Sequence, residues 1–449
     1  MQHPTLDEDG QLEQFGYKQQ LKRALSTRDL LIYGLILMVP IAPYQVFGFV
    51  WNDAKGMVPL AYLLGLVGMF FTAMSYAAMS RDFPMAGSVY SYAQRGLHEI
   101  AGFFAGWLIL LDYILVPALL YVVSAIALRP LLPGVPEWIW LAAFIAFNAT
   151  VNVIGVEFTA RANRCMLVME LVILAMFIVL GLIALYSGKG AGRLTLEPIY
   201  NPAAFSLATI AGATSIAVLS FLGFDGISTL SEEAQGGKEA VGRATLLALL
   251  LAGVLFVSQT WIATDLARGM VFSSPETAFY EITERAGGAW FKIVTLIGVV
   301  IAVGIANAMA AQAAVSRMLY AMARDGKLPA ALARVHTRFK TPYVATLVVA
   351  GISLLVGIFF SAHLDELNRI VNFGALSGFL LLHLSVINHF MIRRRSRAWI
   401  RHFVCPLAGL LVIGYVLYEM DVAAKMMGAF WLLAGVVYYW ALSQRLKRT

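Results

Sequence analysis

Long apolar stretches separated by short polar links make up most of the chain. Each stretch is about twenty residues or longer, the length that an α-helix needs to cross the hydrocarbon core of a bilayer. The pattern predicts an all-α integral membrane protein with about twelve transmembrane helices. The expected helices cover residues 28–51, 57–80, 98–127, 136–155, 164–187, 204–231, 240–265, 287–323, 342–361, 368–391, 400–418 and 423–443.

Two of these helices are interrupted near their centres. In the first helix, Pro43 within PIAPYQVFGF removes a backbone donor and clashes with the preceding turn. In the sixth, SFLGFDG places two glycines and Asp225 inside an apolar run over residues 205–230. Both interruptions end in a Gly-Phe pair, at residues 48–49 and 223–224. One interrupted helix is as readily a simple kink as a site, whereas two at matching places favour a site.

The two interruptions occupy equivalent positions if helices one to five and six to ten are structural repeats. Repeats of five helices have opposite orientations in the membrane, which is the inverted-repeat plan of many secondary transporters. Unwound segments at the midplane leave amides and carbonyls that can hold a substrate. The sequence therefore predicts a ten-helix transport core over residues 28–391, a cytoplasmic tail over 1–27, and two additional helices with a short tail over 392–449.

Composition and charge agree with a membrane protein. Hydrophobic residues make up 60% of the chain and charged residues only 13%, too little charge to cover a soluble surface. The net charge of +7 does not indicate nucleic acid, because the basic residues lie between the apolar runs. If every segment crosses, most basic residues fall on one side, which predicts a multi-pass protein with both termini cytoplasmic. Those residues include Lys18, Lys22, Arg23, Arg28, Arg161, Arg164, Lys238, Arg243, Arg324, Lys327, Arg334, Arg338, Lys340, the cluster at 393–397, Arg445, Lys447 and Arg448, against Arg129, Lys189, Arg193, Arg268 and Arg369 opposite.

Ionisable side chains within membrane spans are costly and are candidate functional residues. Asp225, at the sixth-helix interruption, is expected to bind an ammonium group, to take part in proton coupling, or both; capping of the following half-helix is the alternative and can coexist. Glu170 lies in CMLVMELVILAMF with no nearby cation in the sequence. Because burial favours the protonated form of a carboxyl group, Glu170 is a candidate for proton coupling. Its alternative role is a neutral acid hydrogen-bonded to a neighbouring helix.

Residues beside the interruptions and on the third helix complete the expected site. Tyr113 offers both a cation-attracting ring and a hydroxyl group, and is favoured over its neighbour Asp112, although plain packing is an alternative for both. Glu232 lies about 9–10 Å along a helix from the interruption. It is expected to be a second amine contact or part of an inner gate, for which Glu233 is also a candidate. The expected substrate-binding residues are Tyr44, Gln45, Phe47, Gly48, Tyr113, Phe221, Gly223, Phe224, Asp225, Glu232 and Asn307.

Other polar residues carry less weight. Gln312 and Asn372 are weaker candidates for the site, while His383 and His389 have no ligand cluster around them and are expected to be structural. The two cysteines have no spacing typical of a disulfide framework or a zinc site. The sequence therefore predicts neither a metal nor a cofactor.

Other classes of protein fit less well. The chain lacks the GxxxxGK[ST] phosphate loop and the HExxH metalloprotease motif, and no catalytic constellation stands out. A major-facilitator carrier also has about twelve spans, but its halves would meet at a long loop after the sixth helix, where this chain has the short link 231–240. A channel is a further alternative, which saturable, pH-dependent uptake with counterflow would exclude.

Three motifs stand out along the chain: FPMAGSVYSYAQRGL at 83–97, SFLGFDGISTLSEEA at 220–234 and SRMLYAMARDGKLP at 316–329. With these motifs the chain resembles the amino acid–polyamine–organocation transporters over essentially its full length. Three segments are most similar to bacterial putrescine importers: LLDYILVP at 110–117, the SFLGFD…TLSEE segment at 220–233 and VNFGA at 371–375. The resemblance implies a LeuT-like 5+5 inverted repeat with broken helices one and six and two further C-terminal helices. It also implies proton-coupled uptake across the inner membrane and a site formed by helices one, three, six, eight and ten.

Two departures from the family pattern bear on the substrate. Many amino acid carriers of the family bind the substrate carboxylate with a Gly-x-Gly turn in the first helix, where this chain has Ala42-Pro43-Tyr44 and Pro43 has no N–H. That difference favours an amine without a carboxylate. The putrescine importers, however, carry an acid in the first helix where this chain has Gln45. The expected function is import of a small, putrescine-like or polyamine-like organic amine by proton symport with alternating access; the alternative is a zwitterionic amino acid permease or an exchanger. Sodium coupling and the oligomeric state are left open.

Overall fold

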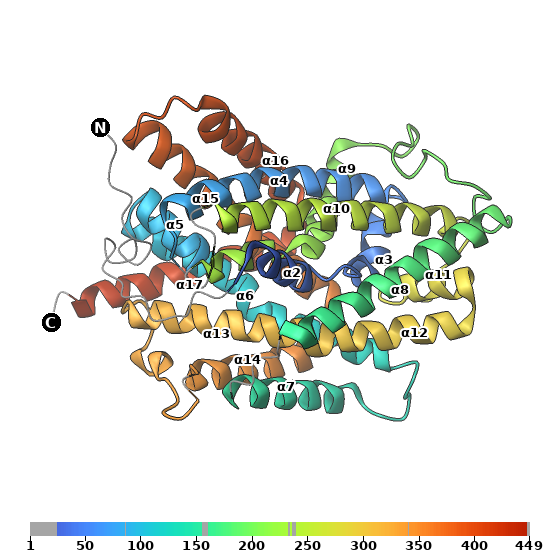
Figure 1. The fold of residues 1–449 in the computed structure, drawn as a ribbon, viewed down its shortest axis with the longest axis horizontal. Helices are drawn as coiled ribbons and strands as arrows, with labels where there is room; N and C mark the ends of the chain where they lie inside the picture. The colour runs from blue at the N-terminus through green and yellow to red at the C-terminus, as the bar shows by residue number, and fades with distance from the viewer. Residues whose placement is uncertain are drawn as a thin grey trace.

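The twelve expected spans are all present as helices. The computed structural model describes residues 25–85, 87–154, 160–231, 234–235, 239–339 and 341–446. Within these residues, 11 helices are long and apolar enough to cross a membrane, or 12 if the bent pair at the start of the chain is one span. Several of the long helices, among them α4, α10 and α13, run along the long axis of the molecule (Figure 1).

The first, sixth and eighth spans are each interrupted by a break or a change of helix type in their middle. The first consists of α2 (Thr27–Met38) and α3 (Pro43–Asp53). The sixth consists of α9 (Leu207–Ala217) and the 3₁₀ segments η1 (Val218–Phe221) and η2 (Phe224–Leu230). The eighth joins α12 (Ala289–Val299), the π-helical η3 (Val300–Asn307) and α13 (Ala308–Arg324).

The remaining spans are less interrupted. They are α4 (Val58–Asp82), α6 (Glu99–Leu128), α7 (Glu137–Ile154), α8 (Ala160–Tyr186), α10 (Ala240–Ala267), α14 (Tyr343–Phe360), α15 (Leu364–Val386) continued by η5 (Ile387–Arg393), α16 (Cys405–Glu419) preceded by η6 (Ile400–Val404), and α17 (Val422–Leu446). Shorter helices between the spans are α5 (Ser88–Gly96), α11 (Ala278–Gly287) and η4 (Ala330–Ala333). Neither α5 nor α11 was expected, because each is too short and too polar to stand out as an apolar run.

Helices that are five spans apart in the sequence contact one another. The first span meets the sixth, through α2 on η2 and α3 on α9. In the same way α4 packs along α10, α6 against α13 and α7 against α14. A pseudo-two-fold axis through the middle of the bundle would bring equivalent helices together in this way. The all-helical, LeuT-like arrangement with interrupted first and sixth helices is therefore confirmed.

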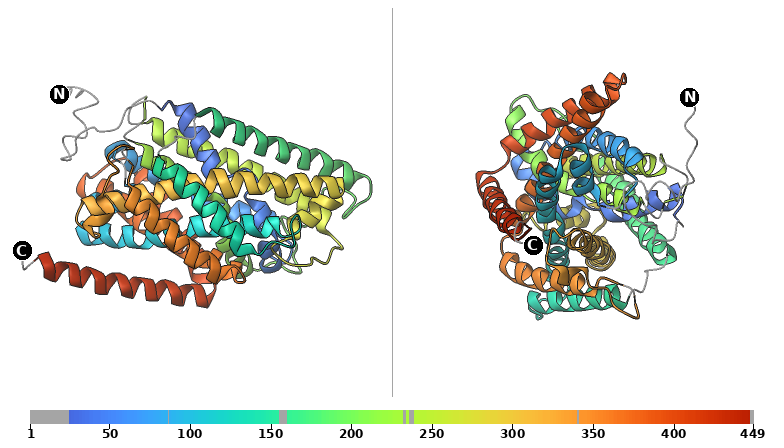
Figure 2. Two further views of the ribbon diagram at one scale, coloured as in Figure 1. Left: turned by 90° about the horizontal axis from the view of Figure 1, so that it is seen from below. Right: turned by 90° about the vertical axis from the view of Figure 1, so that its left-hand side faces the viewer.

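The last two spans flank the bundle. Figure 2 shows α17 lying along one side of it. The indole N–H of Trp107 on α6 donates to the carbonyl of Trp431 on α17 at 2.8 Å, and the indole N–H of Trp431 donates back to the carbonyl of Trp107 at 2.7 Å. Large apolar side chains such as Leu355, Leu411 and Phe430 are exposed, as a lipid-facing surface requires.

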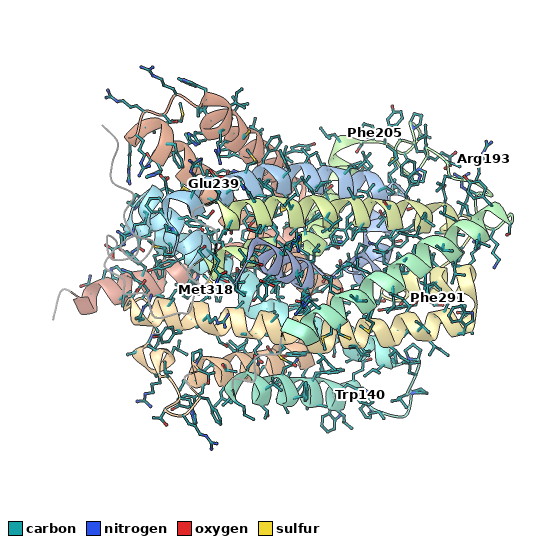
Figure 3. All side chains as sticks on the ribbon, in the orientation of Figure 1. Trp140, Arg193, Phe205, Glu239, Phe291 and Met318 are labelled. Carbon is teal, nitrogen blue, oxygen red and sulfur yellow. The ribbon has the colours of Figure 1, made fainter. Side chains whose placement is uncertain are left out.

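The two ends of the bundle are polar. In Figure 3 the labelled residues Glu239 and Arg193 lie toward opposite ends of the molecule. Glu239 is at the end where α2 begins and α17 finishes, and it pairs there with Arg243 at 2.6 Å. Charge therefore collects where lipid headgroups and water would meet the protein.

Candidate functional site

The first span bends by 53° between α2 and α3. Val39 stands at the bend with a φ of +53°, which is rare for a β-branched residue. Pro43 is the first residue of α3, where the missing N–H breaks no helical hydrogen bond. The carbonyl of Pro40 accepts from the side-chain amide of Gln259 on α10 at 2.9 Å. The bend is therefore stabilised by the surrounding structure, because a neighbouring helix binds the carbonyl that the bend leaves without a helical partner.

The sixth span changes direction at Gly223. Leu222 is extended, and Gly223 has a φ of +108°, so the chain leaves η1 and restarts as η2. A Cβ atom on Gly223 would lie 2.9 Å from the backbone carbonyl carbon and oxygen of Leu37. Glycine is required here both for its backbone conformation and for the close approach of the two chains. The two interrupted spans therefore touch at their breaks.

Asp225 is fixed at the break of the sixth span. Its side chain is only 2% exposed. Oδ2 accepts from the hydroxyl of Tyr113 on α6 at 2.9 Å, and Oδ1 accepts from the N–H of Gly223 at 3.2 Å. The second bond binds the N–H of Gly223, the residue at which the sixth span breaks. The first bond links the sixth span to the third.

A cavity of about 90 Å³ lies where four spans meet. Its walls come from the break of the first span, from α6, from the break of the sixth span and from the eighth span. The walls are mainly apolar, and among the residues that the structure describes no Lys, Arg or His side chain borders the cavity. The predicted binding residues that border it are Gln45, Tyr113, Gly223, Asp225 and Asn307.

Asn307 reaches the cavity from a wide turn of the eighth span. It is the last residue of the π-helical segment η3. The carbonyl of Gly304 within that segment accepts from the side-chain amide of Asn148 on α7 at 2.9 Å. Single π-helical turns occur frequently at functional sites, because they rotate the following side chains relative to a regular helix.

Three predicted residues of α3 do not border the cavity. Tyr44 stacks on Phe279 of α11, with ring centroids 3.9 Å apart. Phe47 packs against the edge of the same ring at 5.4 Å. A Cβ on Gly48 would lie 2.2 Å from the carbonyl oxygen of Pro275, so this glycine allows a close backbone contact. These residues hold α3 against the segment containing α11, and their role in binding stays a prediction.

The two phenylalanines of the sixth span also point away from the cavity. Phe221 packs on Phe256 of α10 with centroids 5.1 Å apart. Phe224 packs on Phe379 of α15 at 5.7 Å. Both residues anchor the break to neighbouring helices. Glu232 and Glu233 lie outside the described residues.

Glu170 is fully buried in α8 but does not border the cavity. Neither of its carboxyl oxygens has a hydrogen-bond partner among the residues that the structure describes. Its alternative role as an acid bonded to a neighbouring helix therefore has no contact to support it in the described part of the chain. The side chain of Asn372 on α15 is likewise buried and without a partner there, whereas Gln312 accepts from Asn152 at 2.8 Å.

The two histidines of the tenth span make structural contacts. His383 is fully buried between helices, with Nδ1 2.9 Å from the hydroxyl of Ser75 and Nε2 3.2 Å from that of Thr72. His389 lies 2.9 Å from a carboxyl oxygen of Asp82. Within the described residues, no group of three or more His, Cys, Asp or Glu side chains is arranged to hold a metal ion.

Helix ten stands behind the cavity rather than in its wall. The resemblance implies a contribution from this helix, but no residue of α15 borders the cavity. Gly374 of α15 instead meets α6 so closely that a Cβ there would lie 2.8 Å from the backbone nitrogen of Asp112. This contact fixes the part of α6 that carries Asp112. Asp112 itself borders the cavity and is missing from the predicted set, although an acid within a span was a visible signal.

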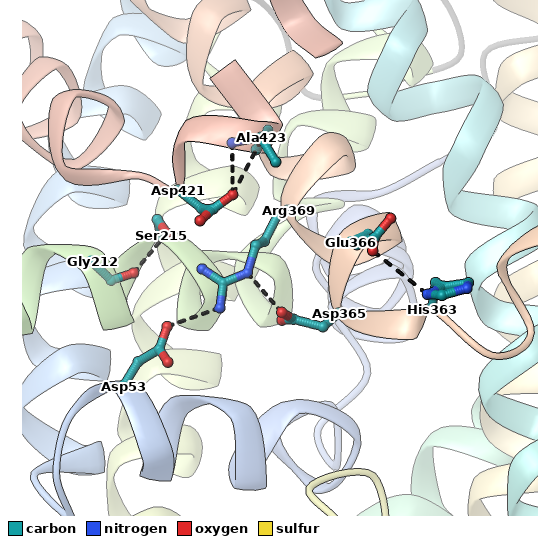
Figure 4. A network of polar contacts seen from close by, with 10 residues as sticks. Asp53, Gly212, Ser215, His363, Asp365, Glu366, Arg369, Asp421 and Ala423 are labelled. Atoms are coloured by element: carbon teal, nitrogen blue, oxygen red, sulfur yellow. Dashed lines mark hydrogen bonds and ion pairs between the residues drawn. The ribbon is translucent and has the colours of Figure 1, made fainter. Parts of the chain in front are cut away.

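Ionic contacts join the helices beyond the cavity. At the end where α3 finishes, the Arg369 guanidinium of α15 donates to Asp53 of α3 at 3.0 Å and to Asp365 at 2.9 Å (Figure 4). At the opposite end, Lys327 pairs with Glu99 at the start of α6. Ion pairs therefore connect neighbouring helices on either side of the cavity.

Two interrupted spans that meet at a small cavity, inside an inverted repeat of membrane helices, are the arrangement of a secondary transporter. A family model described as amino acid permease matches residues 39–438. The chain therefore belongs to the amino acid permease family, within the amino acid–polyamine–organocation superfamily. Its members are membrane permeases rather than enzymes.

Individual relatives differ in their substrates. The low-affinity putrescine importer PlaP of Escherichia coli (strain K12) is 33% identical over 429 residues, 93% of each chain. The branched-chain amino acid permease BcaP of Bacillus subtilis (strain 168) is 26% identical over 455 residues, 95% of this chain and 94% of the relative. The cationic amino acid transporter 4 of Mus musculus is 26% identical over 400 residues, 84% of this chain and 61% of the relative. The chain is thus a multi-pass transporter for small organic cations or amino acids.

Proposed function

We propose that this permease imports a small organic amine of the putrescine type by proton symport with alternating access. The observation that carries the proposal is the setting of Asp225, a buried carboxyl group at a helix break. It borders a cavity whose lining, within the described part of the chain, contains no basic side chain. An ammonium group is the ligand that compensates such a carboxylate, because a buried charge needs an opposite charge and hydrogen bonds. The apolar walls suit a methylene chain. The similarity to a putrescine importer supports the same substrate class.

The backbone around the breaks offers little to a substrate carboxylate. At the first break, the N–H of Ala42 donates to Val39 at 2.7 Å and the N–H of Tyr44 donates to Ile41 at 3.0 Å. At the second break, the N–H of Gly223 donates to the Asp225 side chain at 3.2 Å. Because these amides are already hydrogen-bonded and Pro43 has none, an α-carboxylate would be poorly held. This arrangement favours an amine over an amino acid.

A zwitterionic amino acid permease or exchanger is the second candidate. Gln45 and Asn307 border the cavity, and their side-chain amides offer N–H donors suited to a carboxylate. Two of the relatives are amino acid transporters by name. In that case Asp225 would bind the amino group and the two amides would bind the carboxylate.

Proton coupling is assigned to Asp225 and Glu170. Asp225 is in a position to bind either a proton or an ammonium group, so loading and release of the two can be linked at one carboxyl. Glu170 is buried on α8, which packs against α2 of the broken first span. A change of protonation there would accompany movement of the first span.

The proposed orientation places both termini in the cytoplasm of a bacterial cell, with the protein in the inner membrane. The basic cluster at 393–397 follows the tenth span, at the end where the chain also begins its first span. Short basic loops are retained on the cytoplasmic side during insertion.

The substrate class is tested with purified protein in liposomes. Uptake of putrescine is compared with uptake of ornithine, its parent amino acid, at two external pH values and with a protonophore. We expect saturable uptake and counterflow of putrescine, driven by an inward proton gradient, and weak competition by ornithine. Preference for ornithine would replace the first candidate by the second. Uptake that neither saturates nor shows counterflow would contradict both.

The coupling role of Glu170 is tested with Glu170→Gln, which keeps the shape and removes the titration. We expect the variant to retain counterflow, which needs no net proton movement, and to lose accumulation driven by the proton gradient. Normal gradient-driven accumulation by the variant would remove Glu170 from the coupling step. A loss of counterflow and thermal stability together would instead indicate a structural role.

A further inference from the structure

We infer that Asp112 is a second ammonium-binding group, so that the cavity is built for a diamine rather than a monoamine. This inference rests on the proposed amine import and adds a residue that determines its specificity. It concerns the third span, which supplies one carboxyl group, while the broken sixth span supplies the other.

Asp112 is buried, yet its hydrogen bonding is incomplete. The side chain is 4% exposed and borders the cavity. Its Oδ1 atom has no hydrogen-bond partner among the residues that the structure describes. Leaving a buried acceptor of this kind unpaired is costly, and more so if it is charged. A ligand ammonium in the cavity would supply the missing donors.

The two carboxyl groups of the cavity differ in what the protein already provides. Asp225 accepts hydrogen bonds from Tyr113 and Gly223. Asp112 and Asp225 border the same cavity, and Tyr113, the residue after Asp112, donates to Asp225. Two like charges in apolar surroundings repel each other unless positive charge lies between them. Among the described residues no basic side chain lines the cavity, so the carboxyls are neutralised by protons when the cavity is empty and by the ligand when it is bound. A dication can neutralise both groups at once.

Asp112 also supplies the second acidic group that a dication requires. The first span offers no acid to the cavity, because its polar side chain there is the uncharged Gln45. Both Gln45 and Asp112 border the same cavity, from α3 and from α6. The close contact of Gly374 with the backbone of Asp112 holds the carboxyl-bearing turn in place. The second acidic group of the cavity is thus supplied by α6.

The apolar wall favours a short chain between the two charges. Val116 and Leu119 border the cavity one and two turns further along α6 from Asp112. A hydrocarbon linker can pack against these side chains while each end meets a carboxyl group. The separation of the two carboxyls then selects the number of methylene groups. An α-amino acid would instead bring a carboxylate next to two acids, which is unfavourable.

The test compares diamines with monoamines of equal length in liposomes. Putrescine and 1-aminobutane are measured as a pair, followed by diamines of three to six carbons. For Asp112→Asn we expect the apparent affinity for putrescine to fall about ten- to hundredfold, the range for losing a charged hydrogen bond, with affinity for 1-aminobutane unchanged. Asp225→Asn is expected to lose measurable affinity for both putrescine and 1-aminobutane. Asp112→Glu, which lengthens the side chain by one methylene, is expected to move the optimum to a shorter diamine.

A matched control removes a buried carboxyl group outside the cavity. Asp265 on α10 accepts from the N–H and hydroxyl of Thr195 at 2.8 and 2.7 Å and does not border the cavity. Asp265→Asn is therefore expected to leave the ratio of diamine to monoamine affinity unchanged. Equal losses for putrescine and 1-aminobutane in Asp112→Asn, or an unchanged optimum length in Asp112→Glu, would overturn the inference while amine import stands. Uptake of neither amine by the unmodified protein would overturn the proposed function itself.

Discussion

Replacement of Gly223 by alanine is expected to separate the two broken spans. The residue has a φ of +108°, and an added Cβ would lie 2.9 Å from backbone atoms of Leu37. A side-chain neighbour could rotate away, but a backbone carbonyl can move only with its helix. The substitution therefore forces a choice between a strained dihedral angle and a shift of α2 relative to η2.

The cost has two parts. Holding a non-glycine residue at a strained φ costs about 1–3 kcal/mol. Overpacking against fixed atoms adds about 1–3 kcal/mol. The expected destabilisation is thus about 2–6 kcal/mol. Relief by a shift of η2 would also move Asp225, whose Oδ1 is bound to the Gly223 N–H at 3.2 Å. We therefore expect uptake to fall by about tenfold or more, the equivalent of one lost hydrogen bond at the site.

The assay pairs thermal unfolding in detergent with initial uptake rates in liposomes. Gly351→Ala on α14 is the control, because a Cβ there has nothing within 4 Å. That variant is expected to match the parent or to be slightly more stable, since alanine favours a helix interior. Parental melting temperature and uptake in Gly223→Ala would refute the reasoning that the two breaks must touch at this residue.

Two further substitutions test neighbouring contacts. Tyr113→Phe removes the hydroxyl that donates to Asp225 at 2.9 Å, and we expect the KM for the transported amine to rise about three- to tenfold with little change in melting temperature. Arg369→Ala removes the cation that links α15 to Asp53 of α3. Because this ion pair holds two spans together at one end of the bundle, we expect its loss to give faster counterflow and a less stable protein in detergent. Arg268→Ala, which removes an exposed ion pair, is expected to change neither property, and equal behaviour of the two variants would argue against a role of Arg369 in holding the spans together.

The arrangement of spans could be predicted from the sequence because the bilayer imposes a strict rule. A segment without about twenty apolar residues cannot cross, and backbone groups cannot be left unpaired in lipid. The exceptions to that rule, Pro43 and the SFLGFDG segment, therefore stand out against a uniform background. The same reasoning drew attention to Asp225, since an acid inside an apolar run has few structural explanations.

Only the tertiary structure decided which side chains near the breaks point toward the cavity and which pack on neighbouring helices. Lipid and protein interior are both apolar, so a membrane helix carries little of the polar–apolar contrast that marks a buried face in soluble helices. Each break also changes the rotation of the chain, so periodicity cannot be continued across it. Phe221 and Phe224 accordingly turned out to pack on neighbouring helices. Asp112 borders the cavity from α6, whose backbone at this residue is in close contact with Gly374 of α15. The sequence alone thus determined the spans and where they break, while long-range packing decided which polar groups share the cavity.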